Sequence, residues 1–139
     1  MLDRLAGNEA MKQHLQAALA GGKLAHSLLL CGEKGCGAGF AARCLAADYL
    51  YPQGGPAAEA VLAGQAPECL EVRGEGASGQ IRIERIRQVR EEVFHSALSA
   101  QGRVVLLYGA QNLNSASANA LLMQFQSDIA RVSVSRPVI

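Results

Sequence analysis

The sequence has no tryptophan and few aromatic or charged residues. Aromatic residues make up 4% of the 139 residues, and Asp, Glu, Lys and Arg together make up 18%. Half of the residues are hydrophobic, which excludes a disordered tail or a solvated linker as the whole chain. A chain of this length is typical of one domain with its own core. The composition therefore predicts a helix-rich α or α/β domain with few aromatic anchors.

An excess of one charge is also missing. The 13 Lys and Arg residues balance the 12 Asp and Glu residues, so there is no overall basic field to indicate nucleic acid binding. No apolar run approaches the roughly 20 residues of a membrane-spanning helix. The start, Met1 to Leu5, contains an acidic residue and lacks the apolar stretch of a signal peptide. We therefore expect a cytoplasmic protein with no membrane partner.

The four cysteines do not form a metal-binding pattern. Cys31, Cys36, Cys44 and Cys69 contain no C-x-x-C pair, and no pair of histidines lies nearby. Structural zinc sites need paired ligands at short, fixed spacings. The sequence thus predicts no metal site, and reduced thiols are the default in the cytoplasm.

Strands and helices are predicted to alternate along the chain. From the N-terminus we expect a helix over 9–20 capped by Asn8, a strand over 27–31, helices over 40–50 and 59–63, a strand over 69–72, a helix over 83–97, a strand over 104–108 and a helix from 114 or 115 to 122. The runs 27–31 and 104–108 are almost wholly apolar, as in strands covered on both faces. This alternation predicts a right-handed, mostly parallel α/β sheet.

A glycine-rich stretch, Gly32 to Gly39, separates the first predicted strand from the next helix. Gly32 and Gly37 have the spacing of the phosphate-binding P-loop, G-x-x-x-x-G-K-[S/T], whose backbone N–H groups surround phosphates. However, Ala38 replaces the lysine and Gly39 replaces the hydroxyl residue. We therefore predict a relic P-loop with these cofactor-site positions: Gly32, Gly35, Gly37, Ala38 and Gly39.

The second part of an ATPase site is missing too. An acidic pair that holds Mg²⁺ should follow another strand, but the strand ending at Leu107 is followed by Tyr108 and Gly109. Two losses together predict that the domain does not hydrolyse ATP, has no catalytic residues and needs no cofactor. Two other interpretations stay open. The glycines form only a tight turn, or backbone amides and Lys34 suffice to bind ATP with Mg²⁺.

An ordered set of segments resembles bacterial clamp loaders. These segments are Leu5–Glu9, Lys23–Leu30, the glycine stretch, Val104–Leu107 and Ser117–Leu122. Over residues 2–122 the sequence resembles the N-terminal AAA+ domain of the DNA polymerase III delta-prime subunit. The resemblance implies a three-layer P-loop NTPase fold with a defective nucleotide site. It also implies a scaffold role in loading the sliding clamp onto primed DNA, through contacts with the motor subunits and delta.

Residues 123–139 depart from that family. After Leu122 the family continues differently, and its later strands, its lid and its Ser-Arg-Cys motif are missing here. The family's four-cysteine zinc module is also missing, because residues 51–60 contain no cysteine. We expect a single truncated AAA+ domain over 1–139, cut short or frame-shifted after about residue 122. A truncated product without activity is a third interpretation.

The missing strands raise the question of what lies beside strand 27–31. The sheet is expected to be incomplete at its C-terminal end, which leaves this strand with an open apolar edge. The alternating segment Arg131–Ser135 can fill the place, or a second chain can cover the edge as a homodimer. The arginines over 82–90 can approach DNA phosphates, but the interspersed Glu84, Glu91 and Glu92 favour a solvated helix face.

Overall fold

The structure is a computed structural model that describes residues 1–24, 27–33, 37–74, 80–95, 103–109, 113–116, 119 and 130–138. In chain order its elements are η1 (Leu2–Arg4), α1 (Glu9–Ala20), β1 (Ser27–Glu33), α2 (Ala38–Leu50), α3 (Pro56–Leu62), β2 (Cys69–Val72), α4 (Ile83–His95), β3 (Arg103–Tyr108) and β4 (Ala130–Val138). The predicted helix from 114 or 115 is described only at 115, 116 and 119, where it is helical. Its other residues, and the predicted continuation of α4 to residue 97, lie outside the described part.

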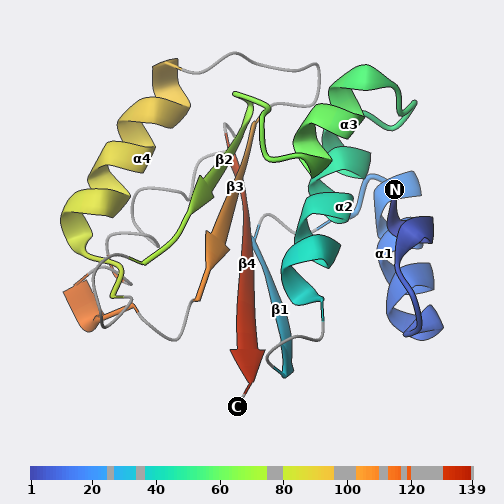
Figure 1. The fold of residues 1–139 in the computed structure, drawn as a ribbon, viewed down its shortest axis with the longest axis horizontal. Helices are drawn as coiled ribbons and strands as arrows, with labels where there is room; N and C mark the ends of the chain where they lie inside the picture. Colours follow the sequence, from blue (N-terminus) through green and yellow to red (C-terminus); the bar gives the residue numbers. More distant parts are fainter. Residues whose placement is uncertain are drawn as a thin grey trace.

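A four-stranded parallel sheet forms the centre of the molecule. Its strand order is β1-β4-β3-β2, and all three pairings are parallel. Parallel strands need crossover connections, and these carry helices to the faces of the sheet. Figure 1 shows α4 on one side of the sheet and α2 on the other, with α1 outside α2. The predicted three-layer α/β class is confirmed.

The alternation of β3 divides the core between the two faces. Val105 and Leu107 belong to a cluster with Ile86 and Val89 of α4. The intervening Val104 and Leu106 belong to a second cluster with residues of α2 and α3. Successive side chains of a strand point to opposite faces, so a strand buried on both faces reads as a continuous apolar run. The four residues are at most 3% exposed.

The helix α1 packs on α2 away from the sheet. Leu15 joins Leu2 of η1 and Cys44 and Leu45 of α2 in a third buried cluster. The predicted cap is confirmed, because the side chain of Asn8 accepts a hydrogen bond from the backbone N–H of Met11 at 3.4 Å. The helix ends at Gly21, as the glycine pair predicts.

The segment at the C-terminal end of the chain supplies the strand beside β1. The predicted strand Arg131–Ser135 lies within β4, which pairs with β1 from Ser27↔Val132 to Glu33↔Val138 and with β3 on its other side. Of the two outcomes considered for that edge, insertion of the chain's own strand is the one found. Within the described sheet, β1 remains an edge strand.

Candidate functional site

The predicted relic P-loop stands between β1 and α2 in the sequence. Gly32 lies in β1, and Gly37 precedes α2 with a φ of 88°, in a region that glycine adopts without strain. The backbone oxygen of Gly37 accepts the N–H of Ala41 at 2.9 Å. Ala38 and Gly39 follow as half-buried residues of α2. Gly35 and Lys34 lie outside the described residues.

The site lies at the carboxyl end of the sheet. Figure 1 shows α2 and α4 both starting at the end to which the strand arrows point. Ligands of open α/β sheets bind outside the carboxyl ends of the strands. Site positions predicted from the sequence lie in β1, α2 and β3. They therefore belong to the end of the sheet where a ligand is expected.

Gly39 of α2 and Tyr108 at the end of β3 lie in direct contact. A Cβ atom added to Gly39 would lie 3.2 Å from Cε1 and 3.7 Å from Cδ1 of Tyr108. In a P-loop ATPase, the loop hydroxyl and an acidic residue after a second strand hold Mg²⁺ between them. Positions 39 and 108 correspond to those two by their place in the motifs. The two residues are neighbours here, but Gly39 has no side chain and Tyr108 offers a phenol in place of a carboxylate.

Tyr108 is held by an ion pair that joins α2 to β2. Its hydroxyl donates to Oε1 of Glu71 at 2.5 Å. Arg43 binds the same carboxylate with two nitrogens, from Nε to Oε1 at 2.6 Å and from Nη2 to Oε2 at 2.9 Å. Arg43 also donates from Nη1 to the backbone oxygen of Leu62 at 3.3 Å. The arrangement ties α2, β2 and β3 together beside Gly39.

These contacts fix the charge state of the cluster. Burial and the hydrogen bond to Glu71 raise the pKa of the Tyr108 hydroxyl, so it stays a neutral donor. Burial alone would raise the pKa of Glu71, but the hydrogen bonds from Arg43 and Tyr108 outweigh it and lower that pKa. The pair thus consists of an ionised carboxylate and a charged guanidinium at neutral pH.

Arg73 covers the ring of Tyr108 from the solvent side. Its guanidinium carbon lies 4.0 Å from the ring centroid, within the range of a cation–π contact, and Arg73 itself is exposed. Sequence reasoning did not select Arg43, Glu71 or Arg73. One signal was available: Glu71 is an acidic residue inside a short strand whose two ends, Cys69 and Val72, are buried.

A small cationic pocket lies at the start of α4. It has a volume of about 130 Å³ and is lined by Arg73, Gln80, Ile81, Arg82, Glu84, Arg85 and Gln88. Arg85 is paired with Glu92 at 3.3 Å, while Arg82 is exposed. The apolar face of α4, with Ile86 and Val89, is buried as the periodicity predicts.

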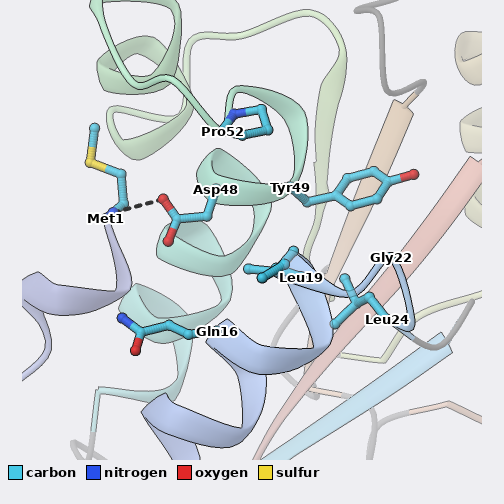
Figure 2. A pocket seen from close by; sticks show the side chains of 9 residues that line it. Met1, Gln16, Leu19, Gly22, Leu24, Asp48, Tyr49 and Pro52 are labelled. Atoms are coloured by element: carbon cyan, nitrogen blue, oxygen red, sulfur yellow. Dashed lines mark hydrogen bonds and ion pairs between the residues drawn. The ribbon is translucent and has the colours of Figure 1, made fainter.

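A larger pocket of about 480 Å³ lies at the opposite end of α2. Figure 2 shows it between the last turns of α1 and α2, with Met1 joined to Asp48. The Asp48 carboxylate accepts hydrogen bonds from the Met1 amino group at 2.7 Å and from the Leu2 N–H at 2.9 Å. This pocket is remote from Gly39, since Asp48 belongs to the last turn of α2 and Gly39 to the first.

The described residues contain neither a cluster of metal ligands nor a helix suited to a membrane. Among those residues, no group of three or more His, Cys, Asp or Glu side chains is placed to hold a metal ion. In the same part of the chain, no helix is long and apolar enough to cross a membrane. Cys44 and Cys69 are buried free thiols, and burial raises their pKa values to about 11 and about 12.

The fold indicates the class of the protein. A parallel sheet covered on both faces, with a glycine-rich stretch of sequence between β1 and α2, is typical of an α/β P-loop-like domain. A solved structure supports this assignment of the fold. It is a DNA polymerase III gamma subunit-related protein from Thermotoga maritima, with a TM-score of 0.58 over 88% of this chain and 39% of that chain, at 15% identity.

The chain belongs to the family described as DNA polymerase III, delta subunit, whose model matches residues 7–126. It is also 30% identical over 126 residues to DNA polymerase III subunit gamma/tau from Mycobacterium bovis, and equally so to that subunit from Mycobacterium tuberculosis. Each match covers 85% of this chain and 22% of the relative, so the chain spans about a fifth of the relatives' length. The expected clamp-loader AAA+ family is confirmed.

Proposed function

We propose that this chain is a non-catalytic AAA+ scaffold domain of a replicative clamp loader, of the delta-prime type, that acts in the cytoplasm through contacts with other subunits. The observation that carries the proposal is the contact between Gly39 and Tyr108. These residues stand at the two positions from which a P-loop ATPase would bind Mg²⁺. Neither supplies an oxygen ligand of the required kind.

The first turn of α2 supports the same proposal. Ala38 stands where the P-loop lysine would meet the β- and γ-phosphates, so this position supplies no cation. Arg43 lies one turn further along α2, but its guanidinium is engaged by Glu71 and the Leu62 oxygen. ATP hydrolysis therefore lacks both its phosphate clamp and its metal ligands among these residues.

The proposed partners are the motor subunits and delta, with the sliding clamp and primed DNA reached through the assembled complex. The relatives are DNA polymerase III subunits, which supports assembly with such subunits. The pocket of Arg73, Arg82 and Arg85 supports a face turned toward DNA phosphates. Because Glu84 and Glu92 offset that charge, we expect the isolated chain to bind DNA only weakly and at low salt.

The alternative function is a P-loop protein that still binds ATP through backbone N–H groups. The geometry at Gly37 favours it in one respect, because a left-handed glycine precedes a 13-residue helix whose first N–H groups attract anions. It predicts saturable binding of ATP by the isolated chain. The scaffold proposal predicts none.

Reconstitution tests the scaffold role. The purified chain is mixed with the motor subunits and delta of its own organism, and complex formation is measured by size-exclusion chromatography with light scattering. We expect one copy of the chain in a complex that loads the clamp onto primed DNA. A chain that elutes alone at every concentration, or as a homodimer under the same conditions, contradicts the proposal.

A further inference from the structure

We infer that Tyr108 is a plug at the start of α2: its ring takes space that a hydroxyl side chain at position 39 needs, so this position would stay closed to Mg²⁺–nucleotide even with the lysine and hydroxyl restored. The inference deepens the proposed non-catalytic function and rests on it. Under this inference, Tyr108 does more than replace the acidic residue of a P-loop ATPase: its ring also keeps the ligand out.

The first step of the inference is steric. A Cβ at position 39 would lie 3.2 Å from Cε1 of Tyr108, closer than ordinary van der Waals contact. Serine and threonine carry further atoms beyond Cβ, and threonine is branched there. A hydroxyl residue at position 39 therefore fits only if the ring moves.

The second step is that the ring is held from three directions. Its hydroxyl is bonded to Glu71, and Glu71 is in turn fixed by two hydrogen bonds from Arg43 of α2. Arg73 lies over one face of the ring. Tyr108 is the last residue of β3, and its backbone is paired with that of Ser135 in β4.

The third step concerns the origin of these restraints. Arg43 and Gly39 are both on α2, four residues apart, so they lie on one side of the helix. The helix α2 would therefore present the hydroxyl at position 39, and the same helix holds Glu71 through Arg43. Glu71 in turn accepts the hydrogen bond from Tyr108. Moving the ring away from Gly39 requires breaking the bond to Glu71 or shifting the Arg43–Glu71 pair.

Nucleotide binding by four versions of the 139-residue chain tests the plug. They are the natural chain, the variant Ala38→Lys/Gly39→Thr, the same variant with Tyr108→Ala, and the same variant with Tyr108→Phe as the matched control. Each is titrated with a fluorescent ATP analogue and Mg²⁺ after circular dichroism shows that it is folded. We expect the Tyr108→Ala triple variant to bind at least tenfold more tightly than the double variant. The Phe variant keeps the ring but lacks its hydrogen bond to Glu71, so its binding should lie between those of the double variant and the Ala triple variant.

Equal binding by the double and Ala triple variants overturns the plug, whether both bind or neither does. Binding by the natural chain contradicts both the proposed function and the plug, because both hold that the start of α2 excludes nucleotide. Equal binding by the double and Ala triple variants without binding by the natural chain overturns the plug alone, so the two failures are distinguishable.

A second measurement needs no nucleotide. Gly39→Ala should lower the melting temperature of the natural chain, because the added Cβ meets the ring. In a Tyr108→Ala background the same substitution should raise it, because alanine is the better helix former. In a Tyr108→Phe background, where the ring lacks its hydrogen bond to Glu71, the melting temperature should fall by less than in the natural chain. An increase in all three backgrounds contradicts the inference.

Discussion

The two ends of α2 differ in an instructive way. At its start, where the glycines have the spacing of a P-loop, the ring of Tyr108 lies close beside Gly39. At its end, where no motif predicts a ligand, a pocket of about 480 Å³ lies between α1 and α2. In the described residues, the larger pocket therefore does not coincide with the predicted P-loop positions. A site is therefore better identified from the residues around it than from its volume.

The two ends also differ in how their polar groups are held. At the start of α2, Arg43, Glu71 and Tyr108 come from three elements and hold one another. At the end, Asp48 takes hydrogen bonds from the first two residues of the chain. The first arrangement joins α2 to the sheet, so its loss should affect stability more.

The largest effect should follow from removing Arg43. We expect Arg43→Ala to lower the free energy of unfolding by about 2 kcal/mol, because it leaves the partly buried Glu71 carboxylate without its cation. Urea unfolding at neutral pH measures this. Arg4→Ala is the matched control, since it removes the exposed Arg4–Glu59 pair and should change stability little. Equal effects of the two substitutions would show that the Arg43 pair is no stronger than a surface pair.

Tyr108→Phe should have a smaller effect. It keeps the ring against Gly39 but removes the hydrogen bond to Glu71, which is worth about 1 kcal/mol. Urea unfolding of Tyr108→Phe, Glu71→Gln and the double variant forms a double-mutant cycle. The account expects the two losses to be strongly non-additive; simple additivity would mean that the two side chains act independently.

Acid should weaken the start of α2 through Glu71. Its pKa in the folded chain lies below its ordinary value of 4.5, so its contribution to stability is present above that pH and is lost as the pH falls through the folded-state pKa. The Glu71→Gln variant should therefore lose less stability than the natural chain as the pH falls below 4.5. If the free energy of unfolding falls equally with pH in the two proteins, Glu71 does not cause the acid sensitivity.

The smallest effect is expected at the other end of α2. Ala20 lines the large pocket, and Ala20→Leu should change the free energy of unfolding by no more than about 0.5 kcal/mol, because both residues favour helices and the pocket has room. Thermal unfolding of Ala20→Leu beside Gly39→Ala measures the contrast directly. A large loss from Ala20→Leu would mean that the pocket is not open space.

Features encoded by neighbouring residues were predictable from the sequence. The cap at Asn8, the end of α1 at Gly21 and the strand over Cys69–Val72 depend on local chemistry and periodicity, and the structure has all three. The segment in β4 was foreseen as one of two ways to cover β1. Its alternating pattern defined a strand, but its position between β1 and β3 depends on long-range pairing.

The candidate site was predictable only as a set of losses. The motifs showed that lysine, hydroxyl and acidic residues are missing at positions 38, 39 and 108. They did not show what replaces them, because Arg43, Glu71 and Tyr108 are separated by 28 and 37 residues and meet only after the sheet has formed. The close approach of Gly39 to Tyr108 likewise depends on how α2 packs on the sheet.

The central claim is that the start of α2 does not bind nucleotide. Titration of the natural chain with a fluorescent ATP analogue and Mg²⁺, up to millimolar concentration, tests it most directly. The account predicts no saturable signal and no change when unlabelled ATP is added. Saturable binding that unlabelled ATP displaces would contradict it, and would favour a P-loop that still holds nucleotide through its backbone.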